Sequence, residues 1–245
     1  MVIYGSNCDY RSSAINDHFF IKHIMQEFVI IVAGGSGSRM GSDIPKQFLN
    51  INGLPILMHT LKAFRAYSET VSIILVLPAD HFDLWQELCD RFSFQIKHKV
   101  IEGGETRFES VKNGLNSIDA QEGIVAVHDG VRPVISKKII SYSYLHAKEF
   151  GTAVACVPSK DSIRRVNSNG ENIAEDRAFF RLIQTPQTFR LDWMRAAFKT
   201  SYQPHFTDCA SVLESAGYAI QLVEGAYENI KITTPEDLKW AEMYL

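Results

Sequence analysis

Residues 29–47 read VIIVAGGSGSRMGSDIPKQ, and the rest of the chain is best interpreted outward from this stretch. Its first five residues are apolar and mostly β-branched, which is typical of a strand buried on both faces of a parallel sheet. Gly34, Gly35, Gly37 and Gly41 follow within eight positions. Glycine lets the backbone approach a ligand closely, and successive N–H groups in such a loop can converge on phosphate oxygens. The stretch therefore predicts a strand that ends in a phosphate-binding loop.

Two well-known glycine loops do not match this stretch. The Rossmann fingerprint is G-x-G-x-x-G, whereas residues 35–41 place one residue too many before the last glycine. The P-loop requires Gly-Lys followed by Ser or Thr, and the chain contains no such sequence. Arg39 and Lys46 add two cations that can lie against one anion. A turn with solvated charges is the alternative, but four glycines and two cations in one turn favour a phosphate site.

The composition of the chain excludes several classes of protein. Its 245 residues are 46% hydrophobic, which suits one sizeable α/β domain with a full core. The net charge of −3 gives no overall basic field and argues against a nucleic acid partner. The apolar runs fall short of the roughly 18–20 residues that span a bilayer, so no membrane association is expected. The four cysteines form no C-x-x-C pair, which argues against structural zinc and suits a cytoplasmic location.

The amino-terminal segment differs from the rest of the chain. Residues 1–27 show no clear periodicity and lack the apolar segment of a signal peptide. We expect them to form a poorly ordered extension without catalytic duty. The domain itself is expected to span residues 28–245.

Apolar runs and helical spacing alternate along the first two thirds of the domain. The segments that read as buried strands are residues 71–78, 99–101, 124–127 and 152–157. The segments with helical spacing are residues 82–92, 107–118 and 137–150. This order predicts an α/β fold with a doubly wound, mostly parallel, Rossmann-like sheet. Such sheets bind ligands at the carboxyl ends of their strands, where residues 34–47, 103–110 and 128–133 are all expected to lie.

Several motifs in a fixed order resemble one enzyme family. From about residue 28 to residue 245 the chain resembles the cytidylyltransferases that make CDP-alcohols, and most of all the 2-C-methyl-D-erythritol 4-phosphate cytidylyltransferase family. The motifs that carry the resemblance are Ala33-Gly34-Gly35-x-Gly37-x-Arg39-Met40, Pro45-Lys46-Gln47, Gly103-Gly104-Glu105-Thr106-Arg107, His128-Asp129-Gly130-Val131-Arg132-Pro133, Thr185-Pro186-Gln187, Thr207-Asp208 and Asn229-Ile230-Lys231-Ile232-Thr233.

The resemblance implies a nucleotidyltransferase of non-mevalonate isoprenoid biosynthesis. The enzyme would transfer CMP from CTP to 2-C-methyl-D-erythritol 4-phosphate, giving 4-diphosphocytidyl-2-C-methyl-D-erythritol and pyrophosphate. The attacking phosphate oxygen is already ionised at neutral pH, so the reaction needs charge neutralisation and positioning and no protein base. This chemistry calls for Arg, Lys, backbone N–H groups and Mg²⁺. By resemblance, Arg39 and Lys46 stabilise the α-phosphate and the departing pyrophosphate, although Lys46 could instead pair with surface carboxylates.

The resemblance also assigns the nucleotide site. It implies that CTP is bound by the glycine loop, the cytosine pocket and the segment after the next strand. These residues are Ala33, Gly34, Gly35 and Gly37, then Gly104, Glu105 and Ser110, and finally Asp129 and Gly130, with Asp129 as the Mg²⁺ ligand. From the residues alone, the glycines before residue 107 could simply cap a helix, and an aspartate at a strand end is more often a cap.

The second substrate is assigned to residues that lie far apart in the sequence. By resemblance, Ser162, Arg132, Arg177 and Lys231 hold methylerythritol phosphate, and Arg177 and Lys231 also act in catalysis. We expect Lys231 to lie on a short strand. Residues 158–181 contain an Asn-Gly turn and read as a hairpin, which could be an ordinary solvated surface element. The resemblance implies that this β-arm hooks onto a second subunit in a homodimer and completes its site.

The alternatives left open come from two classes. The nearest is a ribitol-5-phosphate cytidylyltransferase, which shares almost the same loop motifs. The other is a module that senses CTP without turnover, against which the paired cations argue. Cys209 and Glu228 depart from the family pattern, since an acidic residue and Asp are usual at those positions.

Overall fold

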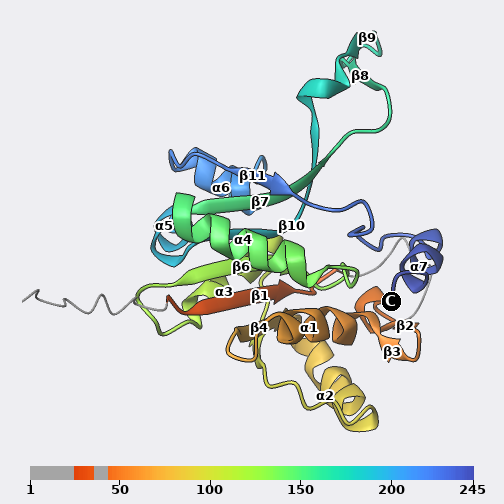
Figure 1. Cartoon of the computed structure of the whole chain (residues 1–245), viewed down its shortest axis with the longest axis vertical. Coiled ribbons are helices and arrows are strands. Elements are labelled where there is room, and N and C mark those ends of the chain that lie inside the picture. The colour runs from red at the N-terminus through yellow and green to blue at the C-terminus, as the bar shows by residue number, and fades with distance from the viewer. Residues whose placement is uncertain (1–24, 36–43) are drawn as a thin grey trace, which may run out of the picture.

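The central element of the chain is one mixed sheet. A computed structural model describes residues 25–35 and 44–245, and within them seven strands form a sheet in the order β11-β7-β10-β6-β1-β4-β5 (Figure 1). The strands of this sheet are β1 (Glu27–Val32), β4 (Ser72–Leu77), β5 (Lys99–Glu102), β6 (Ile124–Asp129), β7 (Thr152–Pro158), β10 (Arg181–Arg190) and β11 (Leu222–Glu224).

Most neighbouring strands run parallel, as the sequence predicts. β1 lies between β4 and β6 and pairs with both in parallel, and β4–β5 and β7–β11 are also parallel. The apolar residues of β1 are buried because helices cover both faces of the sheet. β10 is the exception, since it pairs antiparallel with β6 and with β7. The sequence analysis did not predict this strand.

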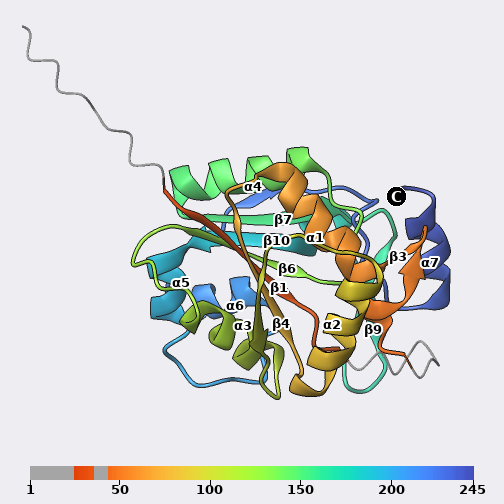
Figure 2. The ribbon, with the colours of Figure 1, turned by 90° about the horizontal axis from the view of Figure 1, so that it is seen from below.

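Helices pack on both faces of the sheet, which gives the doubly wound arrangement. Figure 2 shows α1 and α4 on one side and α3, α5 and α6 on the other. The side chains of the first group, together with α2, form one apolar core, and those of the second group form another. The helices are α1 (Ile56–Tyr67), α2 (Phe82–Arg91), α3 (Arg107–Asn116), α4 (Lys137–Phe150), α5 (Leu191–Ala197), α6 (Cys209–Ser215) and α7 (Pro235–Glu242).

Two helix starts follow directly from local sequence chemistry. Thr106 caps α3 in a capping box with Glu109, and this fixes Arg107 as the first helical residue at the carboxyl edge of the sheet. Thr234 caps α7 and Pro235 occupies its first position, where the missing N–H of proline costs no hydrogen bond. Among the described residues, none of the helices combines the length and the apolar run that crossing a bilayer requires.

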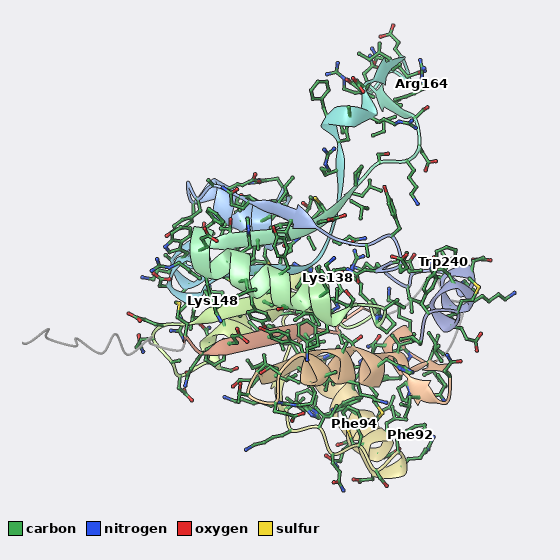
Figure 3. All side chains as sticks on the ribbon, in the orientation of Figure 1. Phe92, Phe94, Lys138, Lys148, Arg164 and Trp240 are labelled. Carbon is green, nitrogen blue, oxygen red and sulfur yellow. The ribbon has the colours of Figure 1, made fainter. Side chains whose placement is uncertain are left out.

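The predicted hairpin is present as a projecting arm. β8 (Ile163–Val166) and β9 (Asn172–Glu175) form a separate antiparallel sheet that stands away from the body of the domain (Figure 1). Arg164 marks its outer end in Figure 3, whereas Trp240 lies on α7 at the rim of the domain. We call residues 158–181 the arm, as in the prediction.

Two sequence expectations need correction. The segment around Lys231 is not a strand, because residues 229–233 have no regular structure. Instead, the N–H of Ile232 donates to the main-chain oxygen of Val131 over 2.9 Å, which fastens this irregular segment to the residue after Gly130. The apolar run at residues 220–223 also predicts a strand, but the last strand is Leu222–Glu224 and so begins two residues later. The remaining small elements are β2 (Asn50–Ile51), β3 (Leu54–Pro55), η2 (Lys46–Phe48), η3 (Ala79–His81) and η4 (Arg177–Phe179).

Candidate active site

A cavity of about 310 Å³ opens at the carboxyl ends of β1, β5 and β6. This is the edge at which an open α/β sheet binds its ligands. The three motif clusters of the sequence meet in it, each from a different part of the chain. Its lining residues are Val32, Ala33, Gly34, Gly35, Lys46, Gln47, Gly104, Glu105, Thr106, Arg107, Ser110, Asp129, Val131 and Lys231. We call it the nucleotide cavity.

A smaller cavity of about 240 Å³ shares part of this wall. Arg107, Asp129 and Lys231 line both cavities and so form the partition between them. The residues that line only the smaller cavity are Arg132, Ile183, Gln184, Thr185, Gln187, Thr207 and Asp208. Two cavities that meet at one charged partition suit two substrates that react with each other.

A larger cavity, about 520 Å³, lies at the opposite end of the sheet. Two of its basic side chains are already bonded next to helix ends: Arg65 donates to the main-chain oxygens of Ser68 and Glu69, just after α1, and Lys99 donates to that of Ser117, just after α3. The cavity is therefore a poorer candidate for an anionic substrate than the carboxyl edge.

Asp129 is the electrostatic centre of the partition. Its carboxylate pairs with Arg132 at 3.2 Å, Lys231 at 3.2 Å and Arg107 at 3.5 Å, and the residue is 5% exposed. Burial alone would raise the pKa of this carboxyl, but the three cations outweigh burial and hold the pKa well below its ordinary value. Three positive charges thus surround one negative charge. The surplus of positive charge is available to a phosphate.

Two of the three residues of η2 anchor the floor of the nucleotide cavity. Lys46 is 8% exposed, and its Nζ donates to the main-chain oxygen of Ile232 over 3.2 Å. The Nε2 of Gln47 donates to the oxygen of Ala33, at the end of β1, over 2.9 Å. The start of the glycine loop and the segment that carries Lys231 are therefore both fastened to η2.

Glycine occupies different positions of the site for different physical reasons. Among the described residues, no atom lies within 4 Å of a Cβ placed on Gly34, so none of them fills the space beside this backbone. A Cβ on Gly104 would lie 2.3 Å from the Cβ of Glu109, so the turn before α3 has no room for a side chain. Gly130 lines neither cavity, because its N–H donates to Val32 and its oxygen accepts from Thr60. Gly130 is thus a packing residue in this structure.

The residues predicted for cytosine lie together on one wall of the nucleotide cavity. Gly104, Glu105 and Ser110 all line it. The N–H of Gly104 donates to the Oγ of Ser110 over 3.1 Å, which closes the turn over the start of α3. Short backbone and hydroxyl groups are therefore presented side by side, as a base edge requires.

Not every predicted residue reaches the site. Ser162 and Arg177 lie on the arm, are exposed and line neither cavity, and Arg177 donates to the main-chain oxygen of Lys160. Gly37 and Arg39 lie outside the described residues. The sequence analysis quoted Arg107 without giving it a firm role and gave none to Gln47 or Thr185. The signal that could have identified these three residues is that each lies in one of the motifs that carry the family resemblance.

His128 precedes Asp129 and is completely buried. Its Nε2 donates to the main-chain oxygen of Arg132 over 3.0 Å, and its Nδ1 has no hydrogen-bond partner. Burial lowers the pKa of His128 to about 4. The ring is therefore neutral at physiological pH and holds the Asp129–Arg132 turn.

The fold and this arrangement of charges define a nucleotidyltransferase. The family model described as 2-C-methyl-D-erythritol 4-phosphate cytidylyltransferase matches residues 28–245. The chain therefore belongs to the 2-C-methyl-D-erythritol 4-phosphate cytidylyltransferase family.

Individual relatives agree with the family match. The 2-C-methyl-D-erythritol 4-phosphate cytidylyltransferase of Bacteroides thetaiotaomicron is 47% identical over 215 residues, which cover 88% of this chain and 97% of the relative. The crystal structure of the 4-diphosphocytidyl-2C-methyl-D-erythritol synthase of Anaerococcus prevotii matches with a TM-score of 0.77 at 27% identity, covering 90% of this chain and 98% of that one. The crystal structure of the 2-C-methyl-D-erythritol 4-phosphate cytidylyltransferase of Francisella tularensis matches with a TM-score of 0.73 at 34% identity, covering 90% of this chain and 100% of that one.

Proposed function

We propose that this chain transfers CMP from CTP to 2-C-methyl-D-erythritol 4-phosphate at the partition between the two cavities. The reaction gives 4-diphosphocytidyl-2-C-methyl-D-erythritol and pyrophosphate and belongs to isoprenoid biosynthesis. One observation carries the assignment of the site: Arg107, Asp129 and Lys231 line both cavities. CTP occupies the nucleotide cavity, and the alcohol phosphate occupies the smaller one.

The reaction at the partition is a displacement at the α-phosphorus of CTP. A phosphate oxygen of methylerythritol phosphate forms the new P–O bond, and the bond to the β-phosphate oxygen breaks. The attacking oxygen carries its own negative charge, so the protein supplies position and positive charge. Lys46, Arg107 and Lys231 neutralise the charge that develops on the α-phosphate. Arg39 is assigned to the same task by the family resemblance alone.

The nucleotide is held by the carboxyl edge of the sheet. Ala33, Gly34 and Gly35 offer backbone to the triphosphate, and the open space beside Gly34 supports this. Gly37 belongs to the same loop by resemblance. Gly104, Glu105 and Ser110 read cytosine, since backbone and hydroxyl groups can bond to its amino group and ring acceptors.

Mg²⁺ fits this site as an ion bound mainly to the nucleotide. Among the described residues no group of three His, Cys, Asp or Glu side chains is placed to hold a metal, and Asp129 is the carboxylate that faces both cavities. Mg²⁺ is commonly held by one or two carboxylates plus substrate phosphates and waters. Asp129 is the protein ligand in this proposal. When bound, the ion neutralises triphosphate charge and favours the departure of pyrophosphate.

The alcohol phosphate is held jointly by two subunits in this proposal. Arg132 and Lys231 line the smaller cavity from within the chain, while Ser162 and Arg177 project on the arm. The arm also exposes apolar side chains, of which Phe179 is 85% exposed. Such side chains suit burial against a second copy in a homodimer, in which the arm of one subunit reaches the cavity of the other.

Pyrophosphate release tests the function. The purified protein is incubated with CTP and Mg²⁺, and with either methylerythritol phosphate or ribitol 5-phosphate. Rapid release with methylerythritol phosphate is expected, and preference for ribitol phosphate would contradict the substrate. Binding of CTP without release of pyrophosphate in the presence of either alcohol phosphate would favour a sensor.

The free thiols of Cys89, Cys156 and Cys209 support the proposal of a reducing, cytoplasmic location.

A further inference from the structure

The guanidinium of Arg107 spans two different partners. Its Nη2 lies 3.5 Å from the Oδ1 of Asp129, and its Nη1 donates to the Sγ of Cys209 over 3.4 Å. Arg107 and Cys209 are 102 residues apart in the sequence. The side chain of Arg107 is 30% exposed, and the residue lines both cavities. Arg107 therefore lies at the partition with one edge held by a carboxylate and the other by a thiol.

The sulfur that Arg107 contacts is fixed in place. Cys209 is the first residue of α6 and is 1% exposed. Its N–H donates to the Oε1 of Gln187 over 3.0 Å, and the N–H of Ala210 donates to the same oxygen over 3.2 Å. The Nε2 of Gln187 donates to Asp208, the cap of α6, over 2.8 Å. These three hydrogen bonds tie the start of α6 to β10 and so fix the position of the Sγ.

A thiol holds a guanidinium differently from a carboxylate. Sulfur is a weak hydrogen-bond acceptor, and a protonated thiol carries no charge. Burial raises the pKa of the Cys209 thiol, so it is neutral at physiological pH. The contact therefore orients Arg107 and takes none of its positive charge. A carboxylate at this position would lie beside Asp208 and would compete with Asp129 and the substrate phosphates for the same cation.

We propose that Cys209 is a positioning residue that orients Arg107 toward the reacting phosphate while leaving the full charge of Arg107 to Asp129 and the substrates. The proposal rests on the proposed function and extends it to a buried residue that lines neither the nucleotide cavity nor the smaller cavity. It predicts that side chains at position 209 change catalysis only through Arg107. It also predicts that charge at this position matters more than size.

Steady-state kinetics of three variants test the proposal. Cys209→Ala removes the contact and should lower kcat about tenfold with little change in the KM for CTP, since a hydrogen bond to a charged group is typically worth roughly that factor. Cys209→Ser keeps a neutral acceptor and should restore kcat to within about threefold. Cys209→Asp should raise the KM for both substrates about tenfold, because it draws Arg107 away from the phosphates. Val212→Ala, buried on the same helix, is the control for packing loss and should keep the wild-type kcat.

A double-mutant cycle separates positioning from general packing. If Cys209 acts through Arg107, the loss caused by Cys209→Ala should disappear in an Arg107→Met background. An equal loss in both backgrounds would overturn the proposal, as would a wild-type kcat in Cys209→Ala. If Cys209→Ala does not fold, the comparison of Cys209→Ser with Cys209→Asp decides the question, and equal KM values in those two would overturn it.

Equilibrium binding of CTP keeps this test distinct from that of the function. Calorimetry on the same variants requires no alcohol phosphate. Weaker CTP binding by Cys209→Asp than by Cys209→Ser is the expected result, even if another alcohol phosphate proves to be the substrate. Equal affinities of these two variants for CTP would contradict the role of Cys209 and leave the reaction itself unaffected.

Discussion

The Nζ of Lys46 donates a hydrogen bond to the main-chain oxygen of Ile232 over 3.2 Å. Ile232 lies 186 residues from Lys46 in the sequence. The bond therefore joins the segment after the glycine loop to the segment that carries Lys231. The Nζ of Lys231 in turn lies 3.2 Å from the Oδ2 of Asp129. The hydrogen bond and the ion pair thereby connect two lysines from opposite ends of the chain to Asp129 through one irregular segment.

Replacement of Lys46 tests whether its positive charge contributes to catalysis. Lys46→Met should lower kcat by about 10²-fold or more, because one preorganised charge contact in a closed site is commonly worth roughly 3 kcal/mol. Pyrophosphate release under saturating substrates measures the effect. The matched control is Lys62→Met on the exposed face of α1, which should behave as wild type. An unchanged kcat in Lys46→Met would remove Lys46 from the mechanism.

The open space beside Gly34 predicts a variant that affects binding without affecting stability. A Cβ on Gly34 meets nothing within 4 Å in residues 25–35 and 44–245, and the φ of this residue is not in the left-handed region. Gly34→Ala should therefore keep the wild-type melting temperature. If the triphosphate occupies that space, the same change should raise the KM for CTP about tenfold or more. Gly104→Ala provides the contrast, because its Cβ would collide with Glu109, and it should lower the melting temperature as well.

The buried ring of His128 predicts a pH dependence of stability. The pKa of His128 is lowered to about 4 in the folded chain, against an ordinary value of about 6.5 in the unfolded chain. Between these values the unfolded chain binds a proton that the folded chain does not, so stability falls as the pH drops through this window. The group alone should contribute a loss of about 2 kcal/mol between pH 7 and pH 5.

Urea unfolding of His128→Gln checks this sign. Other groups also titrate, so the quantity to compare is the loss of stability between pH 7 and pH 5 in each protein. The variant should lose about 2 kcal/mol less than the wild type over that interval. Identical losses would mean that His128 has the same pKa in the folded and the unfolded chain, which would contradict the burial of its ring.

Mixing two defective variants tests the exchange of the arm. Lys46→Met removes a positive charge from the nucleotide cavity of its own subunit, and Arg177→Gln removes one from the arm. If the arm serves the neighbouring subunit, a heterodimer contains one site with both residues intact. Random pairing then restores about a quarter of the wild-type activity, since half of the dimers are mixed and each has one good site in two. No recovery after unfolding and reassembly of the mixture would place Arg177 in the site of its own subunit.

The regular part of the fold follows from local patterns in the sequence. β1 and β4 were predictable because runs of apolar, mostly β-branched residues suit strands that are covered on both faces. β10 was not predictable in this way. It contains Gln184, Thr185 and Gln187, which are buried because hydrogen bonds to distant groups satisfy them. A polar strand of this kind resembles a surface segment until its partners are known.

The candidate site likewise has a part that local sequence patterns predict and a part that they do not. The glycine loop, the turn before α3 and the end of β6 each carry a motif that follows a strand, so their meeting at one edge could be predicted. The contact between Arg107 and Cys209 could not, since it joins two helix starts that only the tertiary fold brings together. Lys231 was expected on a strand, whereas pairing with Asp129 positions it from an irregular segment.

A crystal structure of the protein with CTP and Mg²⁺ tests the central claim most directly. The account predicts that cytosine lies against Gly104 and Ser110 and that the α-phosphate lies within contact distance of Lys46 and Lys231, beside Asp129. A triphosphate bound elsewhere on the chain, with Lys46 and Lys231 turned away from it, would contradict the account.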